Sequence, residues 1–132
     1  MQLSHTPSAL SASFDDPNLV VSAGLVPVVA LAQQVGIGRL ADHHLTVPGS
    51  AGANAGAKVM CLVAGMVAGA DSIDDLGVLR HGAMGKLFDQ VRAPSTLGTF
   101  LREFTFGHVR QLDAVASRTL IGLASQTPVL AG

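Results

Sequence analysis

The sequence is poor in aromatic and charged residues. It has no Trp or Tyr and only five Phe among 132 residues, and charged residues make up 13% of it. Hydrophobic residues make up 48%, which is enough to bury a core and is unlike the composition of a disordered chain. An interior without Trp or Tyr has to be filled by aliphatic side chains, so we expect a core of Ala, Val, Leu and Met.

The sequence also lacks paired cysteines and long apolar runs. Its single cysteine, Cys61, excludes an internal disulfide bond and fits a reducing cytoplasm. The apolar stretches 19–32 and 59–70 are shorter than the roughly 20 residues that a transmembrane helix needs. Residues 1–16 have no basic residue ahead of an apolar run, so we expect no signal peptide. A soluble, cytoplasmic protein without membrane contact is therefore expected.

Positive charge is scarce in the first part of the chain and more frequent in the second. Residues 1–79 carry two basic and six acidic side chains, a net charge of −4, whereas residues 80–132 carry six basic and three acidic ones, a net charge of +3. The second part is thus a candidate surface for a polyanion, although ordinary scatter of surface charge would give a similar pattern.

Apolar residues at helical spacing predict an all-α fold of about six or seven short helices in an irregular bundle. The expected helices span 25–35, 40–44, 59–70, 73–79, 84–91, 97–104 and 109–123. We expect Gly36 and Gly38 to separate the first helix from the second. We expect Ser72 and Ser95 to act as helix N-caps. Residues 1–18 are expected to be flexible, 19–21 to be extended, and 19–132 to form one helical domain.

Two further patterns have structural explanations. Residues 49–58 are rich in Gly and end in Lys58, but the Gly-Lys-Ser/Thr order of a phosphate-binding loop is missing, so we expect a plain loop. His43 and His44 are adjacent and point in different directions on a helix, which argues against a shared metal ion. Helix capping explains the acidic residues Asp71, Asp74 and Asp75 better than metal binding does.

The segment 83–104 is the best candidate for a binding surface. It reads as a helix, a short break at Pro94 and a second helix, which is a helix-turn-helix-like hairpin. The second helix would expose Thr96, Thr99 and Arg102 opposite its apolar side, as contact with phosphates or a DNA groove requires. We expect phosphate contacts from Lys86, Arg92 and Arg110. The same spacing also fits an ordinary helical hairpin in a bundle.

An ordered series of short segments adds a resemblance to a family. The segments are GLVP at 24–27, AQQVG at 32–36, GAK at 56–58, LVAGMVAGADSIDDL at 62–76, LRHG at 79–82, APSTLGTFLR at 93–102 and GHVRQL at 107–112. Together they resemble the N-terminal region of bacterial insertion-sequence transposases of the DDE group-1 type, particularly those of high-GC actinobacteria. The resemblance covers about residues 11–132.

The resemblance implies a role in DNA transposition without catalysis by this chain. In that family a ribonuclease-H-like core with a DDE triad and divalent metal ions, expected to be Mg²⁺, follows the N-terminal region. Its first catalytic Asp would lie beyond Leu130, and no acid of this sequence matches the triad. We therefore expect no enzyme activity and no cofactor, and neither a catalytic nor a metal site.

The partners implied are transposon-end DNA and, for assembly, further copies of the chain; no small-molecule substrate is expected. The protein would lie at the bacterial nucleoid. The alternative is a helical structural or dimerisation module that braces the catalytic core and does not itself bind DNA.

Overall fold

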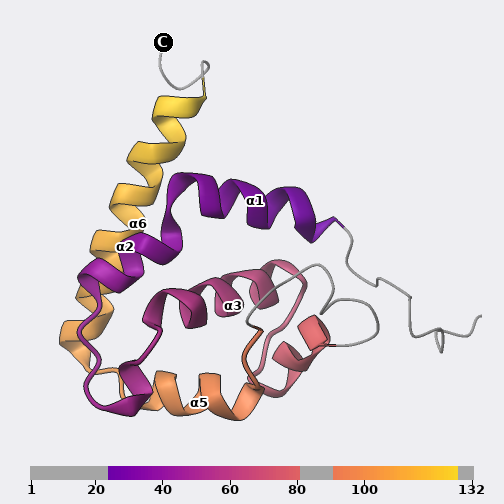
Figure 1. Cartoon of the computed structure of the whole chain (residues 1–132), viewed down its shortest axis with the longest axis vertical. Coiled ribbons are helices and arrows are strands. Elements are labelled where there is room, and N and C mark those ends of the chain that lie inside the picture. Colours follow the sequence, from indigo (N-terminus) through magenta and orange to yellow (C-terminus); the bar gives the residue numbers. More distant parts are fainter. Residues whose placement is uncertain (1–23, 81–90, 128–132) are drawn as a thin grey trace, which may run out of the picture.

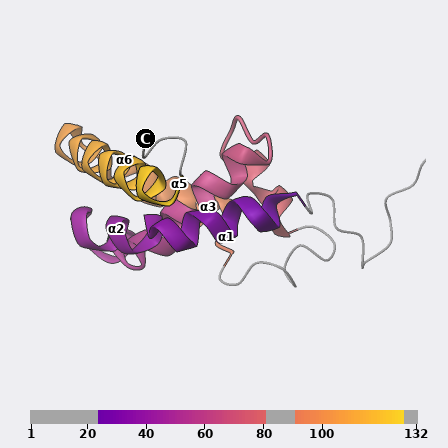
Figure 2. The same ribbon diagram turned by 90° about the horizontal axis from the view of Figure 1, so that it is seen from above.

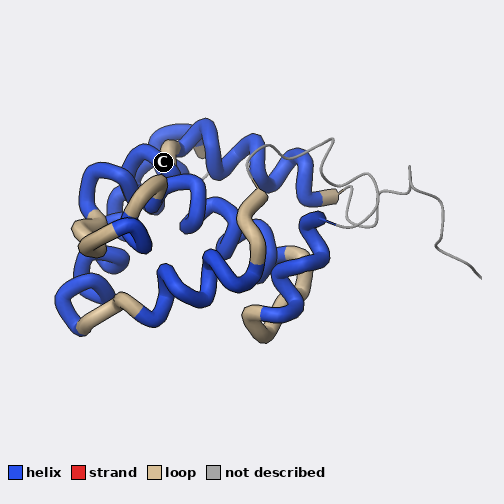
Figure 3. Tube along the Cα trace, turned by 60° about the horizontal axis from the view of Figure 1, so that its bottom comes forward, coloured by secondary structure: helices blue, strands red, loops and turns tan. Residues whose placement is uncertain are grey.

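The computed structural model describes residues 24–80 and 91–127, and the regular structure in these two ranges is entirely helical (Figures 1 and 3). The elements are α1 (Leu25–Val35), α2 (Ile37–His44), η2 (Ser50–Gly52), α3 (Ala55–Val67), η3 (Asp74–Arg80), α5 (Pro94–Arg102) and α6 (Phe106–Gln126), where η denotes a 3₁₀ segment. The predicted all-α class is confirmed. The predicted flexible segment 1–18, the extended stretch 19–21 and most of the predicted helix 84–91 fall outside the described residues. The helix-turn-helix-like hairpin therefore stays a prediction.

Helix α3 occupies the centre of the molecule. It lies between α1 and α5, while α6 runs along one side next to α2 (Figures 1 and 2). Three groups of buried side chains form the core, and α3 contributes to each of them. The groups are Ala41, Leu45, Val47, Ala55, Val59 and Phe100; Leu25, Ala64 and Leu79; and Cys61, Leu76 and Leu97. The expected aliphatic interior is present but contains no fully buried Met among the described residues, of which Phe100 is the one fully buried aromatic.

A left-handed glycine separates α1 from α2. Gly36 has φ 84° and ψ 31°, a conformation that side chains other than Gly rarely adopt, and its N–H donates to the carbonyls of Ala32 and Gln33, each at 3.1 Å. The predicted break at Gly36 is confirmed. The predicted break at Gly38 is wrong, because α2 begins at Ile37 and includes Gly38.

Helices α2 and α3 cross closely, and the residue that must be glycine at this crossing is Gly56, because a β-carbon on Gly38 would lie at an ordinary 3.4 Å from Cγ of Met60. Gly38 of α2 faces Gly56 of α3, so that a β-carbon built on Gly56 would collide with the Gly38 carbonyl oxygen. At the same crossing the Asp42 carboxylate accepts a hydrogen bond from the Gly56 N–H at 2.7 Å. The Asn54 side chain makes no capping bond, so the start of α3 is capped by a residue of another helix.

The buried side of α3 is its small-residue side. We expected a helix over 59–70 and Met side chains in the core, but Met66 is 61% exposed and the helix ends at Val67. The buried positions beyond Val59 are instead Cys61, Ala64 and Gly65. Small side chains let neighbouring elements approach closely, and at Gly65 the space that a β-carbon would need is filled by Leu76 of η3.

Beside the Asp42 cap of α3, the starts of η3 and α6 are capped by side chains that are close in sequence. The predicted cap Ser72 accepts a hydrogen bond from the Asp75 N–H at 3.3 Å, although the segment that follows is a 3₁₀ helix of seven residues. Helix α6 begins at Phe106, earlier than predicted. There the Thr105 N–H donates to Nδ1 of His108 at 2.9 Å, and the Thr105 hydroxyl lies 3.1 Å from the same nitrogen. Together with the bond from the His108 N–H to the Thr105 side chain, the Thr105 N–H bond forms a capping box with His in place of Glu.

Candidate nucleic-acid interface

The outer side of α5 carries the predicted contact residues. Thr96, Thr99 and Arg102 are exposed, whereas Leu97 and Phe100 on the opposite side are fully buried. The spacing of three residues between the exposed side chains places them on one strip of the helix surface. The structure thus brings these three predicted residues together on a helix that is anchored in the core.

The start of α5 differs from the prediction. We expected Ser95 to cap the helix, but the N-cap is Ala93 and Pro94 is the first helical residue. Ala93 is extended, with φ −65° and ψ 148°, because the proline ring disfavours helical geometry at the preceding residue. Proline is well placed here, since its missing N–H would have no partner within the helix. Ser95 lies inside the first turn and is exposed.

Hydrogen bonds along α5 connect Thr99 to Arg102. The Thr99 hydroxyl donates to the Ser95 carbonyl at 3.0 Å and accepts from Nη2 of Arg102 at 3.2 Å. A guanidinium group has five N–H donors, and this contact uses one of them. Because its own proton is engaged by Ser95, Thr99 is suited to positioning Arg102 rather than to donating to a ligand.

The other predicted phosphate contacts are dispersed. Arg92 lies before α5 and is half-buried, with its Nε buried and without a hydrogen-bond partner. Arg110 is exposed and belongs to the second turn of α6. Lys86 lies outside the described residues. The structure therefore supports one compact group on α5 and does not join Arg92 or Arg110 to it.

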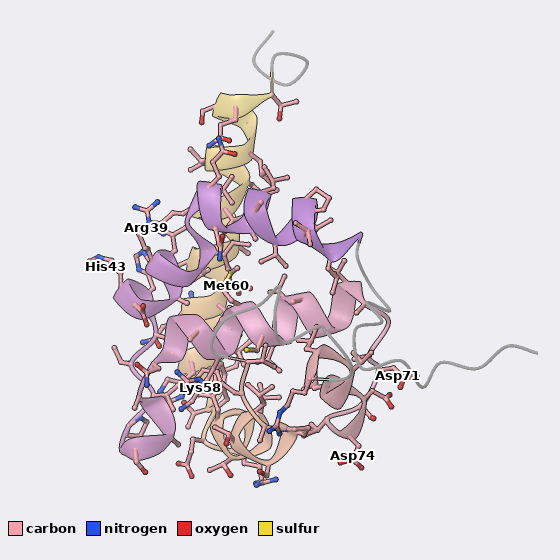
Figure 4. All side chains as sticks on the ribbon, turned by 45° about the vertical axis from the view of Figure 1, so that its right-hand side comes forward. Arg39, His43, Lys58, Met60, Asp71 and Asp74 are labelled. Atoms are coloured by element: carbon pink, nitrogen blue, oxygen red, sulfur yellow. The ribbon has the colours of Figure 1, made fainter. Side chains whose placement is uncertain are left out.

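Lys58 supports α5 from the inside, which sequence reasoning did not anticipate. It is 5% exposed, its Nζ donates to the Ala51 carbonyl at 2.7 Å, and the same atom lies 5.4 Å from the centroid of the Phe100 ring. Figure 4 places Lys58 on α3 within the molecule. The sequence feature that could have indicated this role is a lysine in the first turn of an otherwise apolar helix. The ammonium group links the loop before α3 to α5 through hydrogen bonding and a cation–π contact.

Further basic side chains lie on α2 and α6. Arg39 and His43 are exposed and extend outward from α2, at the opposite end of the molecule from Asp71 and Asp74 (Figure 4). Partial burial, the charge of Arg118 and the neighbouring His43 together lower the pKa of His44. The division of charge between the two parts of the sequence therefore does not correspond to two faces of the fold, since α2 belongs to the acidic part.

The acidic residues after α3 form a separate surface. Asp71, Asp74 and Asp75 line a shallow pocket together with Ala68, Gly69, Ala70 and Val78. The Asp71 N–H donates to the Asp75 carboxylate at 3.4 Å. Hydrogen bonding to Asp71 and then to Ser72 lowers the pKa of Asp75, whereas hydrogen bonding to Asp75 and repulsion from it raise the pKa of Asp71. Such a surface would repel a phosphate backbone.

The described part of the chain contains no group of three His, Cys, Asp or Glu side chains arranged to hold a metal ion. Among the described helices, none is both long and apolar enough to cross a membrane. Comparison with models of protein families, with characterised proteins and with solved structures finds no match. The resemblance to transposases therefore stays a prediction from the sequence segments.

Proposed function

We propose that this chain engages transposon-end DNA as the N-terminal region of an insertion-sequence transposase, and that the outer side of α5 makes the contact. The observation that carries the proposal is the arrangement of α5, where Leu97 and Phe100 fix the helix in the core and leave Thr96, Thr99 and Arg102 exposed. An exposed polar strip with an arginine on a firmly held helix is what contact with phosphates or base edges needs.

In this proposal Arg102 carries most of the contact and Thr99 positions it through the 3.2 Å hydrogen bond. Arg110 and Lys86 would add phosphate contacts that do not depend on DNA sequence. The chain would bind and assemble, and cleavage and joining of DNA would belong to a metal-dependent core outside it. The protein would then be found at the nucleoid.

The test is fluorescence anisotropy with a labelled duplex that carries the terminal repeat of the element, set against a scrambled duplex. Arg102→Gln should weaken binding by about tenfold and reduce the slope of log K against log salt concentration by about one. Arg118→Gln is the matched control, because it removes the same charge from exposed α6. Equal losses in both variants, or no binding of the wild-type chain at low salt, would contradict the proposal.

A second function is favoured by a different observation. Large apolar side chains are exposed on several of the described helices, including Val26, Val28 and Leu31 on α1 and Leu120 and Ile121 on α6. Such surfaces often mark contacts with other protein parts. The chain would then act as a structural or dimerisation module that braces a catalytic core without touching DNA. Anisotropy without binding, together with self-association on a sizing column with light scattering, would favour this second function.

A further inference from the structure

Helix α6 carries a heptad pattern along its whole length. Residues at successive steps of three and four run from its first residue almost to its last: Phe106, Val109, Asp113, Ala116, Leu120 and Leu123. We call this set the α6 seam. Five of the six are apolar. A spacing that averages 3.5 residues keeps one side of a helix facing a second helix wound around it, which is the pattern of a two-stranded coiled coil.

The α6 seam is not the side by which α6 packs on its own fold. The packing side contains the buried Val115 together with Gly122, at which a β-carbon would lie 3.5 Å from Cβ of Val35 on α1. On the seam, Phe106 is 77% exposed, Leu120 is 66% exposed and Val109 is 48% exposed, whereas Leu123 at the end of the seam is half-buried. In Figure 1 the later turns of α6 extend past α1, away from the central helices.

From this we infer that α6 pairs with α6 of a second copy of this chain, in antiparallel orientation. A two-fold axis level with the middle of the helix places Phe106 opposite the partner's Leu123 and Val109 opposite the partner's Leu120. Asp113 then faces the partner's Ala116, a small side chain that leaves its carboxylate room to reach water. A parallel pair would instead place two Asp113 carboxylates side by side, which like-charge repulsion disfavours.

The exposed area sets the strength of this pairing. At the fractional exposures of Phe106, Val109 and Leu120, burial of these three side chains on both chains would remove roughly 800 Å² from water, taking about 200 Å² for a fully exposed large side chain. Stable interfaces bury about 1,200–2,000 Å². The dimer is therefore weak and depends on protein concentration. This inference gives the second proposed function its partner and does not depend on DNA binding.

Sedimentation equilibrium of the full chain over a hundredfold range of concentration, up to about 1 mM, tests it. The wild-type chain should pass from monomer to dimer. Leu120→Ser should raise the dissociation constant at least tenfold, with an unchanged circular dichroism spectrum because the side chain is exposed. Ile121→Ser is the matched control: Ile121 is adjacent, is 69% exposed and lies off the seam, so its loss should leave the dimer intact. Equal effects of the two substitutions would overturn the inference in favour of general apolar association.

A gain of affinity provides the second test. Asp113→Leu should lower the dissociation constant about tenfold or more, since it replaces the one charged position of the seam by an apolar one. A chain that stays monomeric with this substitution overturns the inference. Chains with Asp113→Cys should crosslink to chains with Ala116→Cys in a mixture, whereas crosslinking of Asp113→Cys chains to one another would overturn the antiparallel orientation. Anisotropy with the terminal-repeat duplex, run on Leu120→Ser, separates failure of pairing from failure of DNA binding.

Discussion

Replacing Gly56 by alanine tests the crossing of α2 and α3, on which the central position of α3 depends. The new β-carbon would meet two groups: the carbonyl oxygen of Gly38, and Oδ2 of Asp42 at 2.6 Å. The first is backbone and cannot rotate away. The second can move only if Asp42 gives up the 2.7 Å hydrogen bond that it accepts from the N–H of residue 56.

The free energy of unfolding should fall because two losses exceed one gain. Forcing an extra carbon into a tight helix contact costs typically about 1–3 kcal/mol. Losing a hydrogen bond to a charged group costs about 1.5–3 kcal/mol, part of which the displaced Asp42 recovers from water. Alanine is a better helix former than glycine by about 0.5–1 kcal/mol. The net expectation for Gly56→Ala is a loss of about 2–4 kcal/mol, which is roughly 8–16 °C in Tm for a domain of this size.

Urea unfolding followed by circular dichroism measures the effect, and Gly122→Ala is the matched control. Gly122 also lies inside a helix, but its nearest neighbour, Cβ of Val35, would be 3.5 Å from the new carbon, which is an ordinary contact. The free energy of unfolding of this control should rise by about 0.5–1 kcal/mol, because alanine has the higher helix propensity. If Gly56→Ala is as stable as the wild type or more so, the two helices do not cross at this point and the reasoning fails.

Three further predictions concern stability and titration. Phe100→Ala should reduce the free energy of unfolding, measured with urea, by about 3–5 kcal/mol, since the ring is fully buried. A reduction below about 1 kcal/mol would contradict the burial of Phe100 in the core. His108→Ala should lower Tm and reduce the free energy of unfolding by about 0.5–1 kcal/mol, because it removes the acceptor for the Thr105 N–H. His108→Gln should retain part of this stabilisation. Carboxyl NMR should show Asp75 titrating at lower pH than Asp71, because their contact lowers the pKa of Asp75 and raises the pKa of Asp71. Because the folded-state pKa of Asp75 is lowered, its contribution to stability is present above its unfolded-state pKa and is lost as pH falls through the folded-state pKa. If Asp71 instead titrates at lower pH than Asp75, the contact between them is refuted.

Helix positions were predictable where apolar spacing and backbone chemistry agree. The stripe from Leu25 predicts α1, Gly36 predicts its end, and the residues before Pro128 predict the end of α6 near Gln126. The boundaries of α2 and α3 were missed, because they depend on the approach of one helix to another. Gly38 was expected to break a helix, but here it continues α2, and the close approach of α3 depends on Gly56 instead.

The candidate site was predictable only in part, for a related reason. The exposure of Thr96, Thr99 and Arg102 follows from the helical period, since they lie opposite apolar positions. Periodicity does not reveal that Thr99 and Arg102 are hydrogen-bonded to each other. Nor does it reveal that Lys58 is buried beneath Phe100, because a lysine is usually exposed and its partners are distant in sequence.

Because Lys58 is buried, its chemical reactivity reports how often the structure around it opens locally. The chain has only two lysines, Lys58 and Lys86, so an amine-reactive reagent has few places to attach. Lys58 can be acylated only when the segment around Ala51 moves away and the ammonium group leaves the ring of Phe100. Its labelling rate therefore measures how often the loop before α3 separates from α5, and mass spectrometry of the labelled peptide reads that frequency without any substitution in the protein.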